Sequence, residues 1–138
     1  IRDRSPSRGL GDVYKRQEEF PQRVINPGAA EQLMIGMAAG LAMDGKIPVC
    51  YAITPFVLYR PFEFIRNYVN HENLPVKLVG SGRNDDYGLC GPSHFAWEDL
   101  DVMKALPNID IHYPTFPEEI DIKRFLYSES PAYINLQR

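Results

Sequence analysis

The chain has 138 residues, of which 44% are hydrophobic and 24% charged, a composition typical of one globular domain with a real core. Its net charge is −3, and because the basic excess is confined to residues 1–17, the acidic remainder does not favour nucleic-acid binding. No apolar run is long enough to span a bilayer, so we expect no membrane segment.

Residues 1–17 have the composition of a polar linker and show neither helical nor strand periodicity. They lack the apolar centre of a signal peptide. The segment resembles translated read-through of a sequencing adapter, and the competing interpretations are a disordered basic arm and a natural linker. We treat it as an artefact, expect the true N-terminus to be missing, and assign residues 18–138 to one domain.

Strands and helices are predicted to alternate along the rest of the chain. Short apolar runs indicate buried strands, and apolar residues at helical spacing, such as those at 58, 62, 65 and 69, indicate amphipathic helices. In chain order we predict a strand at 23–26, a helix at 29–43, a strand at 47–53 buried on both faces, a helix at 56–70, a strand at 76–79, a loop at 80–92, a helix at 93–105 with Ser93 as its cap, a strand at 109–112, a helix at 117–128 and a strand at 132–136.

This alternation predicts an α/β fold with a doubly wound, mainly parallel sheet and helices on both faces. Ligands of such sheets bind at the carboxyl ends of the strands. The loops there hold residues 28–31, 54–56 and 80–94. The chain contains neither a GxGxxG nor a GxxxxGK[ST] motif, so neither of these phosphate-binding loops is predicted.

Glu31 is the one acid in the first turn of an otherwise apolar helix rich in small residues. A carboxylate at this place either complements the helix dipole or is kept for chemistry. Taken alone, the residue favours the dipole explanation. The histidines, His71, His94 and His112, are too scattered to suggest a local metal site, and Cys50 and Cys90 form no metal-binding spacing.

Several motifs, in this order and spacing, resemble the pyrimidine-binding domain of thiamine-diphosphate enzymes, and specifically the transketolase family. The resemblance covers about residues 23–138. It rests on Asn26-Pro27-Gly28-Ala29-Ala30-Glu31-Gln32, Gly36 to Ala42, Val76 to Ser81, Gly91-Pro92-Ser93-His94, Trp97-Glu98-Asp99 and Ala105 to Asn108. Each motif alone is a weak signal, and their combination is specific.

The resemblance implies roles for five residues. Glu31 would hydrogen-bond a ring nitrogen of the aminopyrimidine of thiamine diphosphate and so activate the cofactor. Phe56 and Tyr59, three residues apart on one helix face, would stack on that ring, and Ile53 would add an apolar contact. Core packing is an equally good explanation of Tyr59. His94 would face the substrate and transfer protons, which suits a group that titrates near neutrality.

The substrate side of the resemblance is less regular. Arg138 matches a family arginine that binds the substrate phosphate, and Arg83 could supply a charge instead. The family has a histidine where this chain has Gly82, and Cys90 falls near the place of a family acid that contacts the donor. The loop at 83–90 is also shorter. These departures concern the sugar-phosphate substrate and leave the expectation of the cofactor intact.

The family further implies that the site is incomplete in this chain. The diphosphate and a divalent metal, Mg²⁺, would be bound by a second domain or subunit, whose GDG signature is missing here, and no metal ligand is assigned to this chain. We therefore expect a fragment or one part of a split cytoplasmic enzyme, inactive alone, that forms a homodimer or heterotetramer. The small-residue helix at 29–43 would lie at an interface.

The resulting hypothesis is a transketolase-like transferase that moves two-carbon ketol units between sugar phosphates. Two branches of the same superfamily, deoxyxylulose-phosphate synthase and the oxo-acid dehydrogenases, remain alternatives because their pyrimidine domains share the glutamate. A non-catalytic α/β assembly module that kept only the fold is the alternative from another class.

Overall fold

The computed structural model describes residue 15 and residues 17–137, apart from the side chain of Pro117. The artefact prediction for residues 1–17 and the substrate-binding prediction for Arg138 therefore fall largely outside the described residues. The helices and strands are α2 (Glu31–Met43), β1 (Val49–Ile53), α3 (Thr54–Leu58), α4 (Phe62–Phe64), a π-helical segment (Ile65–Asn70), β2 (Lys77–Ser81), α5 (Asp99–Lys104), β3 (Asp110–His112), α6 (Ile122–Tyr127) and β4 (Ala132–Leu136), with 3₁₀ turns at Pro21–Arg23, Gly88–Cys90, Pro92–His94 and Pro117–Glu119.

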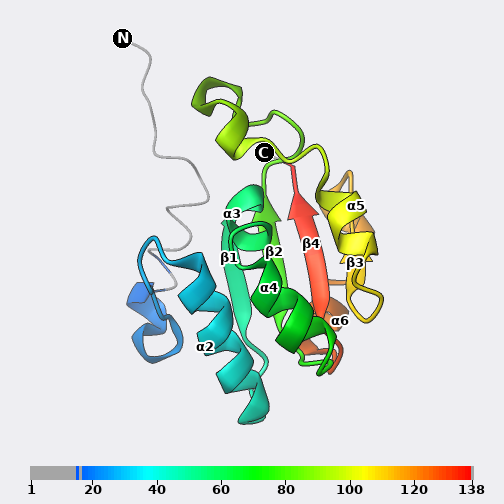
Figure 1. The fold of residues 1–138 in the computed structure, drawn as a ribbon. Helices are drawn as coiled ribbons and strands as arrows, with labels where there is room; N and C mark the ends of the chain where they lie inside the picture. Colours follow the sequence, from blue (N-terminus) through cyan, green and yellow to red (C-terminus); the bar gives the residue numbers. More distant parts are fainter. Residues whose placement is uncertain (1–14, 16, 138) are drawn as a thin grey trace.

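The four strands form one sheet in the order β1-β2-β4-β3, and every neighbouring pair is parallel. Figure 1 shows α2, α4 and α5 in front of the sheet and α6 behind it. Because α6 joins β3 to β4 on the face opposite the other helices, the sheet is doubly wound. The predicted α/β fold is confirmed.

Two apolar clusters fill the two faces of the sheet. The larger one packs Ile35 of α2, Leu58 of α3 and Met103 of α5 against Leu78 and Tyr133 on the sheet. The smaller one, on the face of α6, is formed by Phe125, Ala132 and Ile134. Since neighbouring residues of a strand point to opposite faces, β2 and β4 contribute alternately to both clusters.

Lys77 is fully buried on the α6 face of β2. Its ammonium group donates to the carbonyl oxygen and the hydroxyl oxygen of Ser128, both at 2.8 Å, and to the carbonyl oxygen of Ser130. Burial lowers the pKa of this amine. The three oxygens satisfy all three donors, so the lysine ties the turn after α6 to the start of β2.

Two predicted strands differ from the structure. The segment at 23–26 forms no ladder with any described strand: Pro21–Arg23 is a 3₁₀ turn, Val24 is extended, and Ile25 is exposed. Strand β1 is not buried on both faces, because it is an edge strand whose Val49 and Tyr51 side chains are 50% and 43% exposed. The short α6 lies behind β3 and β4, so none of the described helices covers this face of β1.

Three predicted helices are shorter or broken. The helix predicted at 117–128 is a 3₁₀ turn at Pro117–Glu119 followed by α6, which spans only Ile122–Tyr127. The helix at 56–70 begins two residues earlier, at Thr54, and is interrupted at Pro61, which cannot donate a backbone hydrogen bond. The helix at 93–105 begins only at Asp99, because Phe95 is extended and the Ala96 amide donates to the Asn84 carbonyl oxygen at 2.8 Å. Ser93 therefore caps no helix.

Candidate functional site

The carboxyl ends of the parallel strands meet at one edge of the sheet, where α2 begins and α3 follows β1 directly. Glu31 is the first residue of α2, Phe56 lies in α3, and His94 ends the 3₁₀ turn at Pro92–His94. These three residues belong to segments far apart in the sequence. A chain of contacts now connects them, and we call Glu31, Arg60, Phe56 and His94 the edge cluster.

Arg60 provides the first contact of the edge cluster. Its Nη1 donates to both carboxylate oxygens of Glu31, at 3.0 Å to Oε1 and 2.9 Å to Oε2. The Glu31 side chain is 13% exposed, whereas that of Arg60 is 51% exposed. The carboxylate is therefore largely withdrawn from water and the cation that neutralises it is not.

Phe56 joins the two halves of the edge cluster. The Arg60 guanidinium carbon lies 3.9 Å from the centre of the Phe56 ring, the geometry of a cation–π contact. The Phe56 and His94 ring centres are 4.9 Å apart with an interplanar angle of 67°. One aromatic ring thus touches both the partner of Glu31 and the histidine.

His94 is held by its own turn. Ser93 Oγ lies 3.0 Å from His94 Nδ1, and the Tyr87 ring lies 6.2 Å from the imidazole. The Tyr87 hydroxyl is in turn 3.1 Å from Ser81 Oγ at the end of β2. Ser93 thus engages Nδ1 of the imidazole, and the contacts found among the described residues do not engage the other ring nitrogen, Nε2.

Gly82 explains one of the departures from the family pattern. Its φ is +88°, and a Cβ atom there would lie 2.4 Å from Tyr87 Cε2. The backbone conformation and the tyrosine ring both exclude a side chain at this position. Tyr87 occupies the space at which a histidine would otherwise project.

Arg60 was missed by the sequence reasoning, although a signal was present. Phe56 and Arg60 are four residues apart in a stretch whose backbone stays helical through Tyr59, so they share a helix face. An arginine one turn from a stacking aromatic residue predicts a cation–π pair. Its contact with Glu31, across 29 positions of sequence, could not be read from any local pattern.

The Tyr59 side chain, unlike that of Phe56, belongs to the core of the domain. It packs against the larger core cluster, and its buried hydroxyl has no hydrogen-bond partner among the described residues. Burial, followed by the charges of Glu98 and Asp99, raises the pKa of this phenol. Ile53 ends β1 directly before α3 and is half-buried, as an apolar contact at this edge requires.

Replacing Tyr59 with phenylalanine is expected to raise the free energy of unfolding by about 1 kcal/mol. The change removes a buried hydroxyl that has no partner in the described part of the chain, while keeping the ring in the core. Urea denaturation of both proteins measures the difference. A loss of stability would show that the hydroxyl has a bound partner such as an internal water, and would contradict this account.

Arg83 is engaged inside the protein and not at the edge cluster. One of its guanidinium nitrogens, Nη2, donates to the carbonyl oxygen of Asn135 at 2.7 Å and to that of Pro114, and the guanidinium carbon lies 3.8 Å from the centre of the Tyr113 ring. The side chain is buried. It joins the ends of β2 and β4 to the segment after β3, which leaves little of it for a substrate.

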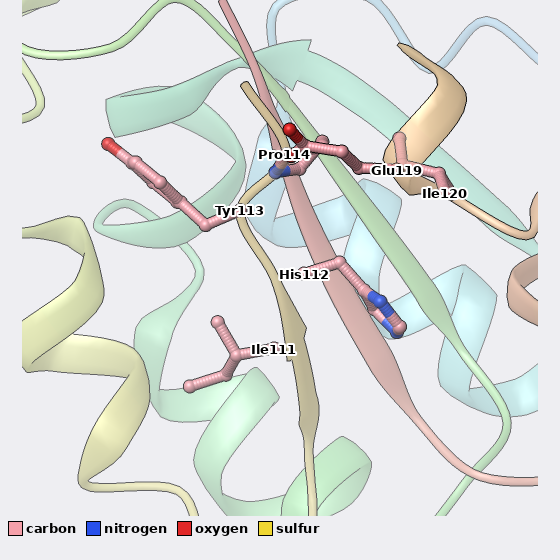
Figure 2. A pocket seen from close by; sticks show the side chains of 6 residues that line it. All are labelled: Ile111, His112, Tyr113, Pro114, Glu119 and Ile120. Carbon is pink, nitrogen blue, oxygen red and sulfur yellow. The ribbon is translucent and has the colours of Figure 1, made fainter. Parts of the chain in front are cut away.

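A concave region lies beside β3, and none of the edge-cluster residues lines it. It has a volume of about 240 Å³ and is lined by Ile111, His112, Tyr113, Pro114, Glu119 and Ile120. Figure 2 shows Ile111 and Tyr113 pointing to one side of the strand and His112 to the other. Its polar groups therefore do not converge, and Glu119 already accepts a hydrogen bond from the Thr115 amide at 2.8 Å.

Comparison with known proteins identifies the domain. Residues 6–132 match the model of the transketolase pyrimidine-binding domain. The chain belongs to this family. Relatives include a protein described as a putative transketolase C-terminal section from Methanocaldococcus jannaschii, 39% identical over 88% of this chain and 39% of the relative. Another is one subunit of an apulose-4-phosphate transketolase from Actinobacillus succinogenes, 37% identical over 86% of this chain and 39% of the relative.

Solved structures agree with this assignment. A structure described as a split gene transketolase, inactive beta4 tetramer, superposes with a TM-score of 0.78 at 36% identity, over 99% of this chain and 43% of that one. Transketolase from Campylobacter jejuni, at 20% identity and a TM-score of 0.73, shares the fold over 82% of this chain and 18% of that one. This pyrimidine-binding domain thus spans about two fifths of the length of the first curated relatives.

The transketolase family depends on thiamine diphosphate, and the edge cluster of this domain suits the pyrimidine end of that cofactor. The Arg60 guanidinium, a planar cation with N–H donors, lies against both the Glu31 carboxylate and the Phe56 face. A protonated, planar aminopyrimidine would likewise offer N–H donors to the carboxylate and a flat ring to the face of Phe56. Among the described residues, no group of three or more His, Cys, Asp or Glu side chains could hold a metal ion.

No helix in the part of the chain that the structure describes is long and apolar enough to cross a membrane.

Proposed function

We propose that this domain supplies the pyrimidine half of a thiamine diphosphate site in a transketolase-type transferase that moves two-carbon ketol units between sugar phosphates. The observation that carries the proposal is the edge cluster, which gathers a largely buried carboxylate, an aromatic face and a histidine at the carboxyl edge of the sheet. The names of the relatives, which include parts of transketolases, support the same reaction class.

Each residue of the edge has a separate role in this proposal, which follows from its position. Thiamine diphosphate supplies a carbon nucleophile that carries the two-carbon unit. Glu31 would bind a ring nitrogen of the pyrimidine and hold or release a proton there, and Phe56 with Ile53 would orient the ring and exclude water. His94, whose ring contacts Phe56, would exchange protons with the oxygens of the substrate.

A partner must complete the site. The domain spans about two fifths of its first relatives, of which one is named as a C-terminal section and the other as one subunit of a transketolase. We propose that a second domain or subunit binds the diphosphate together with Mg²⁺, and that the enzyme works as a homodimer or heterotetramer in the cytoplasm. No metal ligand is assigned to this chain.

The test is reconstitution. The chain is combined with the diphosphate-binding subunit of a split transketolase, thiamine diphosphate and Mg²⁺, and ketol transfer between two sugar phosphates is measured by chromatography of the products. We expect transfer only when all components are present. Failure of the assembled protein to bind thiamine diphosphate would refute the proposal and favour a non-catalytic module.

A specific relative keeps one alternative open. The domain is 34% identical, over 88% of its length and 19% of the relative, to 1-deoxy-D-xylulose-5-phosphate synthase from Prochlorococcus marinus. The same reconstituted protein is therefore supplied with pyruvate and glyceraldehyde phosphate. Release of carbon dioxide without ketol transfer between sugar phosphates would assign this domain to the synthase branch.

A further inference from the structure

Arg60 lies where the proposed function needs open space. Its Nη1 lies 2.9 and 3.0 Å from the two Glu31 oxygens, and its guanidinium carbon lies 3.9 Å from the Phe56 ring centre. Both groups are the ones that would receive the pyrimidine. A separation of 3.9 Å is a van der Waals contact, so no second planar ring fits between the guanidinium and this face of Phe56.

Arg60 and the pyrimidine of the cofactor therefore cannot contact Glu31 and this face of Phe56 at the same time. Glu31 cannot offer its carboxylate to a pyrimidine nitrogen while the guanidinium holds both oxygens, and the pyrimidine cannot stack on the face of Phe56 that the guanidinium covers. A bound cofactor must displace Arg60 from both partners. Any free energy that holds Arg60 in place is subtracted from cofactor binding.

Arg60 is also able to leave. Its side chain is half exposed, and ion pairs with one partner in water are weak. Glu31, by contrast, is largely buried at the start of the 13-residue helix α2. The arginine is the movable partner and the glutamate the fixed one.

We propose that Arg60 is a latch, which closes the pyrimidine position in the cofactor-free domain and opens when thiamine diphosphate displaces it. This inference rests on the proposed function, since it regulates the same site. The latch keeps the Glu31 carboxylate neutralised while the position is empty, and it reduces the affinity of the site for the cofactor.

The test measures the dissociation constant of thiamine diphosphate by calorimetry, at fixed Mg²⁺, for the chain assembled with its diphosphate-binding subunit. Replacing Arg60 with methionine removes the charge and the N–H donors while keeping a long side chain. We expect the variant to bind about 3- to 30-fold more tightly, the range of a weak ion pair and a cation–π contact together. R60K keeps the charge without the planar guanidinium, and its dissociation constant is expected to lie between those of the unmodified protein and Arg60→Met.

Arg66→Met is the matched control. Arg66 is exposed on the segment that follows α4, and its Nη1 donates to Asn67 Oδ1 at 2.8 Å, away from the edge cluster. This variant is expected to bind thiamine diphosphate within about twofold of the unmodified protein. Unfolding of the cofactor-free proteins is followed in parallel, because a merely structural arginine would lower stability without tightening binding.

The two proposals fail in different ways. If Arg60→Met binds the cofactor as well as or more weakly than the unmodified protein, while Glu31→Gln weakens binding at least about tenfold, the latch is refuted and the proposed function stands. If Glu31→Gln and Phe56→Ala both leave the dissociation constant unchanged, the pyrimidine site is refuted, and the latch with it.

Discussion

Replacing Glu31 with glutamine is expected to lower kcat of the reconstituted enzyme by about 10²- to 10⁴-fold, the contribution of a positioned acid–base group. The amide has nearly the same shape as the carboxylate, but it cannot take up or release the proton that the pyrimidine nitrogen requires. Exchange of the reactive thiazolium proton of bound thiamine diphosphate for deuterium, followed by NMR, reports this step directly. We expect the exchange rate to fall with kcat.

Glu63→Gln provides the control. Glu63 is an acid on α4, on the same face of the sheet as α2, and belongs to no contact of the edge cluster. Its replacement is expected to change neither the exchange rate nor kcat by more than about twofold. If the two glutamine variants behaved alike, Glu31 would be a residue that serves the helix dipole alone, and the assignment of the edge cluster to the cofactor would be wrong.

Replacing Asp99 with alanine is expected to lower the free energy of unfolding by about 3 kcal/mol. Asp99 is 1% exposed, and its Oδ2 accepts from the Tyr133 hydroxyl at 2.7 Å and from Asn135 Nδ2 at 2.5 Å. Alanine leaves two buried donors without an acceptor, which costs more than the hydrogen bonds contribute when formed. Urea denaturation gives the difference.

Asp101 serves as the matched control on the same helix. It is exposed and pairs with Lys104 at 3.1 Å, so Asp101→Ala is expected to stay within about 0.5 kcal/mol of the unmodified protein. Asp99→Asn still accepts from Tyr133 and is expected to be intermediate, which keeps the test informative if the alanine variant does not fold. Equal stability of the two alanine variants would contradict the role of the buried network.

The Asp99 network also ties the start of α5 to the sheet. Asp99 is the first residue of α5, directly after the loop that carries His94, and it is tied to Tyr133 and Asn135 on β4. The Asn135 carbonyl oxygen in turn accepts from Arg83 at 2.7 Å. These bonds fix the end of the loop that carries His94 against the sheet.

Local patterns in the sequence predicted most of the framework. The apolar run of β4 matched its observed bounds, and Leu58, Ile65 and Val69 are all fully buried, as their helical spacing indicated. The predicted helix at 93–105 was wrong in its first half because a tertiary contact, between Ala96 and Asn84, holds the chain out of a helix before α5 begins at Asp99. Periodicity reports which residues are apolar, and it does not report which distant segment captures a backbone amide.

The candidate site, like the fold, was predicted only in part from the sequence. The sequence alone determined that Glu31, Phe56 and His94 would meet, because they follow or precede elements that end at one edge of a parallel sheet. Only the tertiary structure decided their contacts: that Arg60 holds Glu31, that Tyr59 turns into the core, and that Arg83 points inward. Side-chain partners 29 to 52 positions apart depend on packing geometry, which no local spacing encodes.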